Sequence, residues 1–208
     1  SSRVSFTFDV IHHDSITPDT AYRVDMAVGA TKFEAPDLFD SVPGIANYYR
    51  GSSAVEGVPA YRRGIYADVI DHIDFHVYGS SAGPRMAFVV RPGGNPATIK
   101  LNFTGQDSIG IDWEGALKVY LDGKWVKLEQ AVAYQVEGDG TLVDVGWTAA
   151  YVHEEGTVYA GFNFGSYDPG LPLVLQIGYG PLGLGGGTDT RDMDWSTYVG
   201  GGGELIRA

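Results

Sequence analysis

The sequence contains no cysteine, which excludes disulfides, thiolate catalysis and cysteine-type zinc sites. Basic residues are also few, because 14 Lys and Arg stand against 26 Asp and Glu, for a formal net charge of -12. Such an acidic surface repels phosphate backbones and anionic lipid headgroups, so we expect neither nucleic acid nor a membrane surface as a partner. No apolar run approaches the roughly 18 residues of a membrane-spanning helix, so we expect no membrane insertion.

The sequence also lacks the common catalytic motifs. The chain has no GxSxG nucleophile elbow, no HExxH metal motif and no phosphate-binding P-loop. Two facing carboxylates would suffice for a hydrolase, but with 26 acidic residues some pair can always be proposed, so that signal carries little information. We therefore expect a protein that is not an enzyme, and keep a carboxylate-based hydrolase as the last alternative.

Glycine and aromatic residues are abundant, with 30 Gly and 13 Tyr, a composition that suits many short strands joined by tight turns. Apolar and polar residues alternate with a period of two, which is typical of half-buried strands. This alternation predicts strands at residues 3–11, 73–78, 85–92, 97–103, 116–121, 141–147, 158–164 and 171–177.

Turn signals separate these strands. Asp122-Gly123 lies between two alternating runs, and Asp-Gly is a strong hairpin signal because a type I′ turn needs positive φ at both central residues. Residues 36–42 and 66–72 are the two segments that we expect to form short helical turns. The fold class predicted is all-β, an antiparallel β-sandwich or two packed sandwich subdomains.

The chain divides into three parts by composition. Residues 1–177 form the predicted sandwich, residues 178–194 a glycine-rich acidic linker, and residues 195–208 the first strand or strands of a following region or partner. In the last part, Trp195, Tyr198 and Val199 precede four glycines, and Leu205 and Ile206 begin another strand. These five residues are our candidates for an inter-domain or assembly strand.

Two sets of polar residues are weak candidates for a metal site. His72, Asp74 and His76 alternate along a predicted strand, but neighbouring ligands on one strand face stand about 7 Å apart, so we favour a solvated face over a transition-metal site. Asp189, Asp192 and Asp194 lie on the glycine-rich linker and match no standard Ca²⁺ loop, so we favour a solvated linker. We expect no cofactor, with Ca²⁺ as the alternative.

Exposed aromatic residues could instead stack on a ligand such as a sugar. Trp113 and Trp125 are the candidates, and Trp125 falls outside the apolar pattern of its strand. Aromatic residues more often pack in cores or pair across strands, and we favour that interpretation.

Six segments in order resemble one known family: GIANYYRG (44–51), VPAYRRGIYADVIDHIDFHVYGS (58–80), FVVRPGGNPATIKLNFTG (88–105), AVAYQV (131–136), YDPGLPLVLQI (167–177) and WSTYVGG (195–201). Together they are similar to the β-rich domain of unknown function at the N-terminus of bacterial secreted proteins that carry SBBP repeats. The resemblance covers about residues 22 to 201. It departs from the family's pattern at Gln176-Ile177-Gly178, where an IDP sequence is usual, and in the length of residues 178–194.

The resemblance implies no catalytic residues. It implies a structural module of a bacterial secreted or cell-surface protein, which supports or caps a following propeller-type repeat region or packs against neighbouring surface-assembly subunits. A carbohydrate-binding or adhesive module, with a polysaccharide as partner, is the first alternative.

Overall fold

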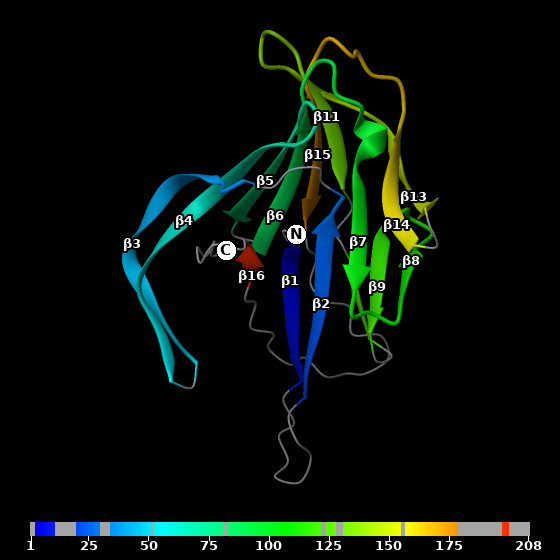
Figure 1. The fold of residues 1–208 in the computed structure, drawn as a ribbon. Coiled ribbons are helices and arrows are strands. Elements are labelled where there is room, and N and C mark those ends of the chain that lie inside the picture. Colours follow the sequence, from blue (N-terminus) through cyan, green and yellow to red (C-terminus); the bar gives the residue numbers. More distant parts are fainter. Residues whose placement is uncertain are drawn as a thin grey trace.

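The computed structural model describes residues 3–10, 20–29, 34–50, 52–80, 83–121, 124–127, 131–154, 157–178 and 197–199. Among them lie sixteen strands and one short 3-10 helix (Figure 1). The first strands are β1 (Arg3–Val10), β2 (Thr20–Val28), β3 (Asp37–Arg50), β4 (Ser53–Ile70), β5 (Ile73–Ser80) and β6 (Gly83–Val90). They are followed by η1 (Pro96–Thr98), β7 (Lys100–Thr104), β8 (Ser108–Ile111), β9 (Leu117–Leu121), β10 (Lys124–Lys127) and β11 (Val132–Val136). The last are β12 (Leu142–Asp144), β13 (Trp147–Glu154), β14 (Thr157–Phe164), β15 (Leu173–Gly178) and β16 (Thr197–Val199).

The strands form three antiparallel sheets. One has seven strands in the order β12-β11-β15-β6-β5-β4-β3, and a second has six in the order β13-β14-β7-β2-β1-β16. A third sheet, β10-β9-β8, adds three strands. The predicted all-β antiparallel architecture is therefore confirmed. The hairpin predicted around Asp122-Gly123 is also confirmed, because Leu121 of β9 pairs with Lys124 of β10.

One hydrophobic core joins the sheets. Phe75 and Phe88 of the seven-stranded sheet pack ring against ring at 5.0 Å between centroids, and both are fully buried. Met26 and Leu101 contribute from the six-stranded sheet, and Val119 from the three-stranded sheet, to the same buried cluster. Along β5, the alternate residues Ile73, Phe75 and Val77 enter this core, as the period-two pattern predicts.

Both expected helical turns are wrong. Residues 37–50 and 53–70 instead form the long strands β3 and β4, which pair antiparallel. The helix-like spacing of Tyr66, Val69 and Ile70, all buried, has another cause. The β4–β5 ladder shifts register between Tyr66 and Ile70, and a β-bulge of this kind turns residues three and four apart to the same side. The bulge imitates the period of a helix.

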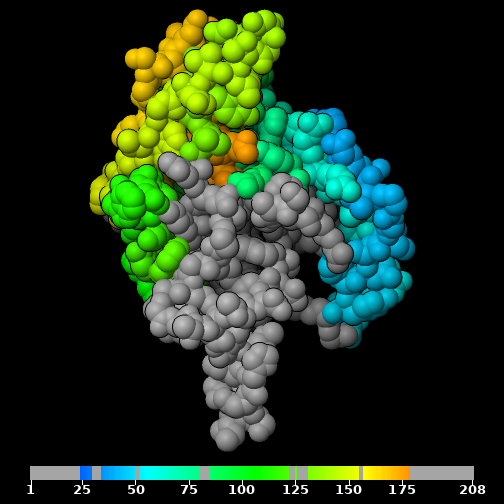
Figure 2. Space-filling view, turned by 180° about the vertical axis from the view of Figure 1, so that it is seen from behind, coloured from blue at the N-terminus to red at the C-terminus, as the bar shows by residue number. Residues whose placement is uncertain are grey.

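The hairpin of β3 and β4 extends beyond the sandwich as a curved arm, which we define as residues 37–65. Figure 1 shows the arm bending away from the body, and Figure 2 shows it from behind, in blue and cyan, at one side of the molecule. Its ladder contains register shifts at Val42/Ile45 and Ala46/Tyr48. Such bulges bend a strand and increase its twist, which accounts for the curvature.

Candidate functional site

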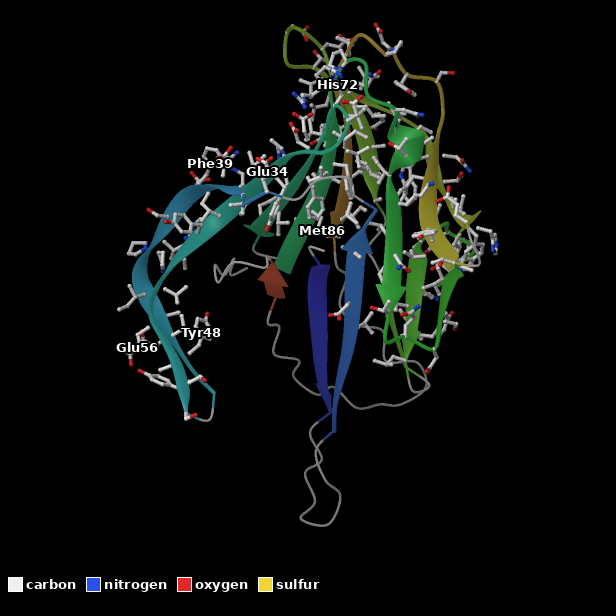
Figure 3. All side chains as sticks on the ribbon, in the orientation of Figure 1. Glu34, Phe39, Tyr48, Glu56, His72 and Met86 are labelled. Carbon is white, nitrogen blue, oxygen red and sulfur yellow. The ribbon has the colours of Figure 1, made fainter. Side chains whose placement is uncertain are left out.

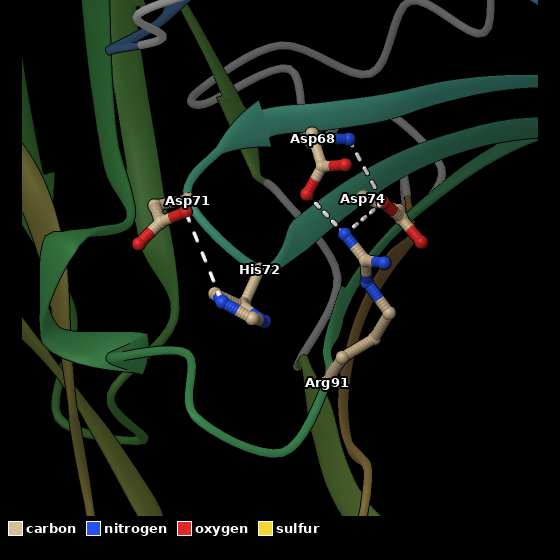
Figure 4. Close-up of polar contacts among 5 residues, drawn as sticks. All are labelled: Asp68, Asp71, His72, Asp74 and Arg91. Carbon is tan, nitrogen blue, oxygen red and sulfur yellow. Dashed lines mark hydrogen bonds and ion pairs between the residues drawn. The ribbon is translucent and has the colours of Figure 1, made fainter.

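A cluster of charged side chains lies where β4 turns into β5. It contains Asp68 at the bulge, Asp71 and His72 in the turn, Asp74 on β5, and Arg91 in the loop after β6 (Figure 4). Two of the segments that carry the family resemblance, residues 58–80 and 88–105, therefore meet here in space. We take this cluster as the candidate functional site.

The carboxylate of Asp74 holds the bulge in place. Its Oδ1 accepts a hydrogen bond from the backbone N–H of Asp68 at 2.9 Å, and Asp68 has a left-handed backbone with a φ of +48°. An aspartate tolerates this conformation better than most residues. Because the bulge removes Asp68 from the ladder, the side chain of Asp74 replaces a lost backbone acceptor.

Arg91 joins the loop after β6 to both carboxylates. Its guanidinium forms an ion pair with Asp68, and its Nη2 lies 3.4 Å from Asp74 Oδ1. Its backbone N–H also donates to the carbonyl of His72 at 2.9 Å. One cation thus faces two anions, and these contacts use one oxygen of each carboxylate.

His72 lies in the β4–β5 turn and precedes β5. Its φ is +58°, and its Nε2 stands 3.9 Å from Asp71 Oδ1 rather than facing Asp74. The loop after β6 packs against this turn at Gly94, where an added Cβ would come within 3.0 Å of the His72 carbonyl oxygen. The sequence pattern placed His72 on the same strand face as Asp74 and His76, and this was wrong because the strand starts one residue later.

His76 lies further along β5 and is half-buried. Burial lowers the pKa of its imidazole from the usual 6.5, and Arg63 lowers it further, while Asp74 opposes the shift. Burial therefore favours the neutral form of this imidazole. Across the described part of the chain, no three His, Asp or Glu side chains are grouped so that they could hold a metal ion.

A second polar contact braces the loop between β14 and β15. The side chain of Gln135 is buried, at 5% exposed. Its Nε2 donates to the carbonyls of Asp168 (2.7 Å) and Leu171 (3.3 Å), and its Oε1 accepts from the N–H of Asp168 (2.8 Å). The segments AVAYQV and YDPGLPLVLQI, which lie far apart in the sequence, are therefore one structural unit.

The two tryptophan candidates differ in their surroundings. Trp113 is 91% exposed, at a turn where Asp112 Oδ1 accepts from the N–H of Glu114 (3.0 Å) and of Ala116 (2.9 Å). Trp125 lies on β10 and is partly covered, because Lys118 Nζ stands 4.4 Å from its ring centroid. Trp113 is thus presented to solvent on a firmly hydrogen-bonded turn, whereas one face of Trp125 already has a cationic partner.

Several sequence candidates lie outside the described residues: Asp189, Asp192, Asp194, Trp195, Leu205 and Ile206. Tyr198 and Val199 belong to β16, which pairs with β1 through the register Val4↔Val199. Asp68, Arg91 and Gln135 were not among the site residues predicted from the sequence. Only Gln135 had a usable signal, since a polar residue at an inward position of an alternating strand is expected to have buried hydrogen-bond partners.

The fold and these contacts define an antiparallel β-sandwich in which polar side-chain clusters hold the loops in place. The chain belongs to the DUF7948 family, described as a domain of unknown function, whose family model matches residues 10–176. No curated protein and no solved structure matches the chain. Within the described residues, no helix has the length and apolar character needed to cross a membrane.

Proposed function

We propose that the chain is a non-enzymatic structural module of a large bacterial secreted or cell-surface protein. Its role is to support or cap a following propeller-type repeat region, or to pack into a surface assembly. The observation that carries this proposal is the arm of β3 and β4, which projects from a well-packed sandwich (Figure 1). The sequence resemblance supplies the kind of polypeptide in which the arm would act.

The convex side of the arm carries large apolar side chains in solvent. Ile45 is 69% exposed and Tyr49 is 67% exposed. Figure 3 shows Phe39 on the same outer side, where the guanidinium of Arg63 stands 4.9 Å from its ring centroid. Covering an isoleucine or tyrosine completely contributes up to about 1.5–3 kcal/mol each.

A hairpin by itself is marginally stable in water. The described strands give the outer part of the arm no third strand, because β3 is the last strand of its sheet and β5 pairs with β4 only from Arg63 onward. A long arm with exposed apolar side chains is therefore stabilised by contact with a neighbouring domain or subunit. The arm therefore favours an interaction module over a catalytic one.

Hydrogen exchange of the arm tests the proposal. We expect the amides of residues 44–59 to exchange about tenfold more slowly in the native full-length polypeptide than in the isolated chain, which corresponds to about 1.4 kcal/mol of contact energy. Ile45→Ser should remove this protection. Leu142→Ser is the matched control, because Leu142 is 62% exposed on β12, at the other end of the same sheet. Equal exchange in both forms would contradict the proposal.

Trp113 favours a second candidate function, a carbohydrate-binding or adhesive module. A tryptophan that is 91% exposed on a rigid turn offers a complete ring face for stacking. Binding of the chain to insoluble polysaccharides distinguishes this function. Retention that Trp113→Ala abolishes would support it, and equal recovery of both proteins in the unbound fraction would exclude it for the polysaccharides used.

A further inference from the structure

A row of aromatic and cationic side chains crosses the outer face of the seven-stranded sheet at the base of the arm. Cross-strand pairing places Phe39 of β3 opposite Arg63 of β4. It also places Arg63 opposite Tyr78 of β5, and Tyr78 opposite Arg85 of β6. Directly paired residues point to the same side of a sheet, and that side is the outer one because Val77, next to Tyr78, lies in the core. We call Phe39, Arg63, Tyr78 and Arg85 the arginine row.

Interactions within the row show that its members lie close together. The guanidinium of Arg63 stands 4.9 Å from the ring centroid of Phe39. The pKa of Tyr78 is raised by burial and by Tyr134, whereas Arg85 opposes the shift, so the guanidinium of Arg85 stands near the phenol. The row is thus held on a hydrogen-bonded sheet rather than on a loop.

The row concentrates positive charge on a chain that is otherwise acidic. Only 14 Lys and Arg stand against 26 Asp and Glu, yet Arg63 and Arg85 are two strands apart in one row, about 10 Å between backbones. Asp40 Oδ2 lies 3.7 Å from Arg63 Nη2, with the two side chains 60% and 44% exposed. An exposed ion pair of this kind contributes little, so Arg63 can exchange Asp40 for a better-placed carboxylate.

The composition of the row is typical of protein–protein interfaces, in which Tyr, Phe and Arg are enriched and Tyr and Arg often dominate the binding energy. Phe39 lies on the convex side of the arm (Figure 3), so the row continues the surface that the proposed function assigns to a neighbouring domain or subunit. Ile65, which pairs with His76 on the same outer face, adds apolar area beside the cations. Apolar area next to Arg and Tyr favours a protein surface over an acidic polysaccharide.

We propose that the arginine row binds an Asp or Glu carboxylate of this neighbouring protein surface above Tyr78. A carboxylate in that position accepts hydrogen bonds from the Tyr78 hydroxyl and from the guanidiniums of Arg63 and Arg85. The inference rests on the proposed function and names the chemistry of its partner: an acidic side chain surrounded by apolar residues that cover Phe39 and the convex side of the arm.

Zero-length cross-linking in the native full-length polypeptide tests the proposal. A water-soluble carbodiimide joins a lysine amine to a carboxylate in contact with it, whereas arginine does not react. Arg63→Lys and Arg85→Lys therefore each place a reactive amine in the row while keeping the positive charge. Arg62→Lys is the matched control, because Arg62 is exposed on the same strand and alternates to the opposite face. Mass spectrometry then locates the carboxylate that has reacted.

We expect a cross-link from position 63 or 85 to an Asp or Glu of the neighbouring domain or subunit, at a yield several-fold above that of the Arg62→Lys control. Cross-links to Asp37 or Asp40 alone, or equal yields in test and control, would overturn the proposal. Cross-linking between isolated copies of the chain that grows with protein concentration would overturn it in favour of self-association. Retention of the isolated chain on polygalacturonate that Arg63→Gln abolishes would assign the row to an acidic polysaccharide instead.

A second measurement separates this inference from the proposed function. Arg63→Gln combined with Arg85→Gln should make the amides of residues 44–59 exchange several-fold faster in the full-length polypeptide, whereas Arg62→Gln should leave them unchanged. Arm protection that persists in the double variant contradicts the role of the row and leaves the proposed function standing. Absence of protection in the parent polypeptide contradicts both.

Discussion

Replacing Gln135 by leucine removes the brace between β11 and the loop before β15 while almost preserving the volume of the side chain. The amide of Gln135 makes three hydrogen bonds to the backbone of Asp168 and Leu171. In Gln135→Leu, two carbonyls and one N–H of the loop lose these partners. Each unsatisfied group costs about 1–3 kcal/mol when buried, and less where water can reach it.

Because the loop is only part-buried at these bonds, we expect Gln135→Leu to lower the free energy of unfolding by about 2–4 kcal/mol. Urea denaturation followed by tryptophan fluorescence measures this change, as a lower midpoint with an unchanged slope. Gln176→Leu is the matched control, since Gln176 pairs with Ala87 on the outward face of the same sheet. We expect that control to stay within about 0.5 kcal/mol of the parent.

The reasoning would be refuted if Gln135→Leu were as stable as Gln176→Leu. A destabilised Gln135→Leu with a much smaller slope would also count against it, because a changed slope indicates an altered unfolded or native state rather than lost hydrogen bonds.

Three further predictions concern other sites. Burial lowers the pKa of His76, so on acidification below pH 6.5 the unfolded state binds a proton before the folded state does. The contribution of His76 to the free energy of unfolding is therefore complete above pH 6.5 and is lost as the pH falls through the folded pKa. Urea midpoints measured across this pH range should fall less in His76→Gln than in the parent. Gly94→Ala places a Cβ 2.9 Å from Val90 Cγ1 and should lower the melting temperature, because overpacking costs about 1–3 kcal/mol of stability. Gly138→Ala is the control and should leave the melting temperature unchanged, since a Cβ there meets nothing within 4 Å; equal melting temperatures of the two variants would refute this prediction. Trp113→Ala should change the free energy of unfolding by less than about 0.5 kcal/mol, and a larger loss in a denaturation curve would show that this side chain packs against the fold.

Local sequence patterns were sufficient to predict those elements whose structure is determined by neighbouring residues in the chain. The alternation in residues 73–78 predicted β5, and Asp122-Gly123 predicted the pairing of β9 with β10. The strand position predicted for His72 was wrong for a reason that local pattern could not reveal. Whether His72 belongs to the strand or to the turn depends on the register of β4 against β5.

The sequence by itself determined an acidic, cysteine-free, all-β chain, because composition, alternation and turn residues act over a few neighbouring positions. Only the tertiary structure decided that the helix-like spacing of Tyr66, Val69 and Ile70 is a bulge, and that Arg91 reaches across to Asp68 and Asp74. It also decided that one hairpin leaves the sandwich as an arm with two different faces. These features depend on which distant strands become neighbours and in which register, and each such pairing is selected by the packing of the whole core rather than by any short stretch of sequence.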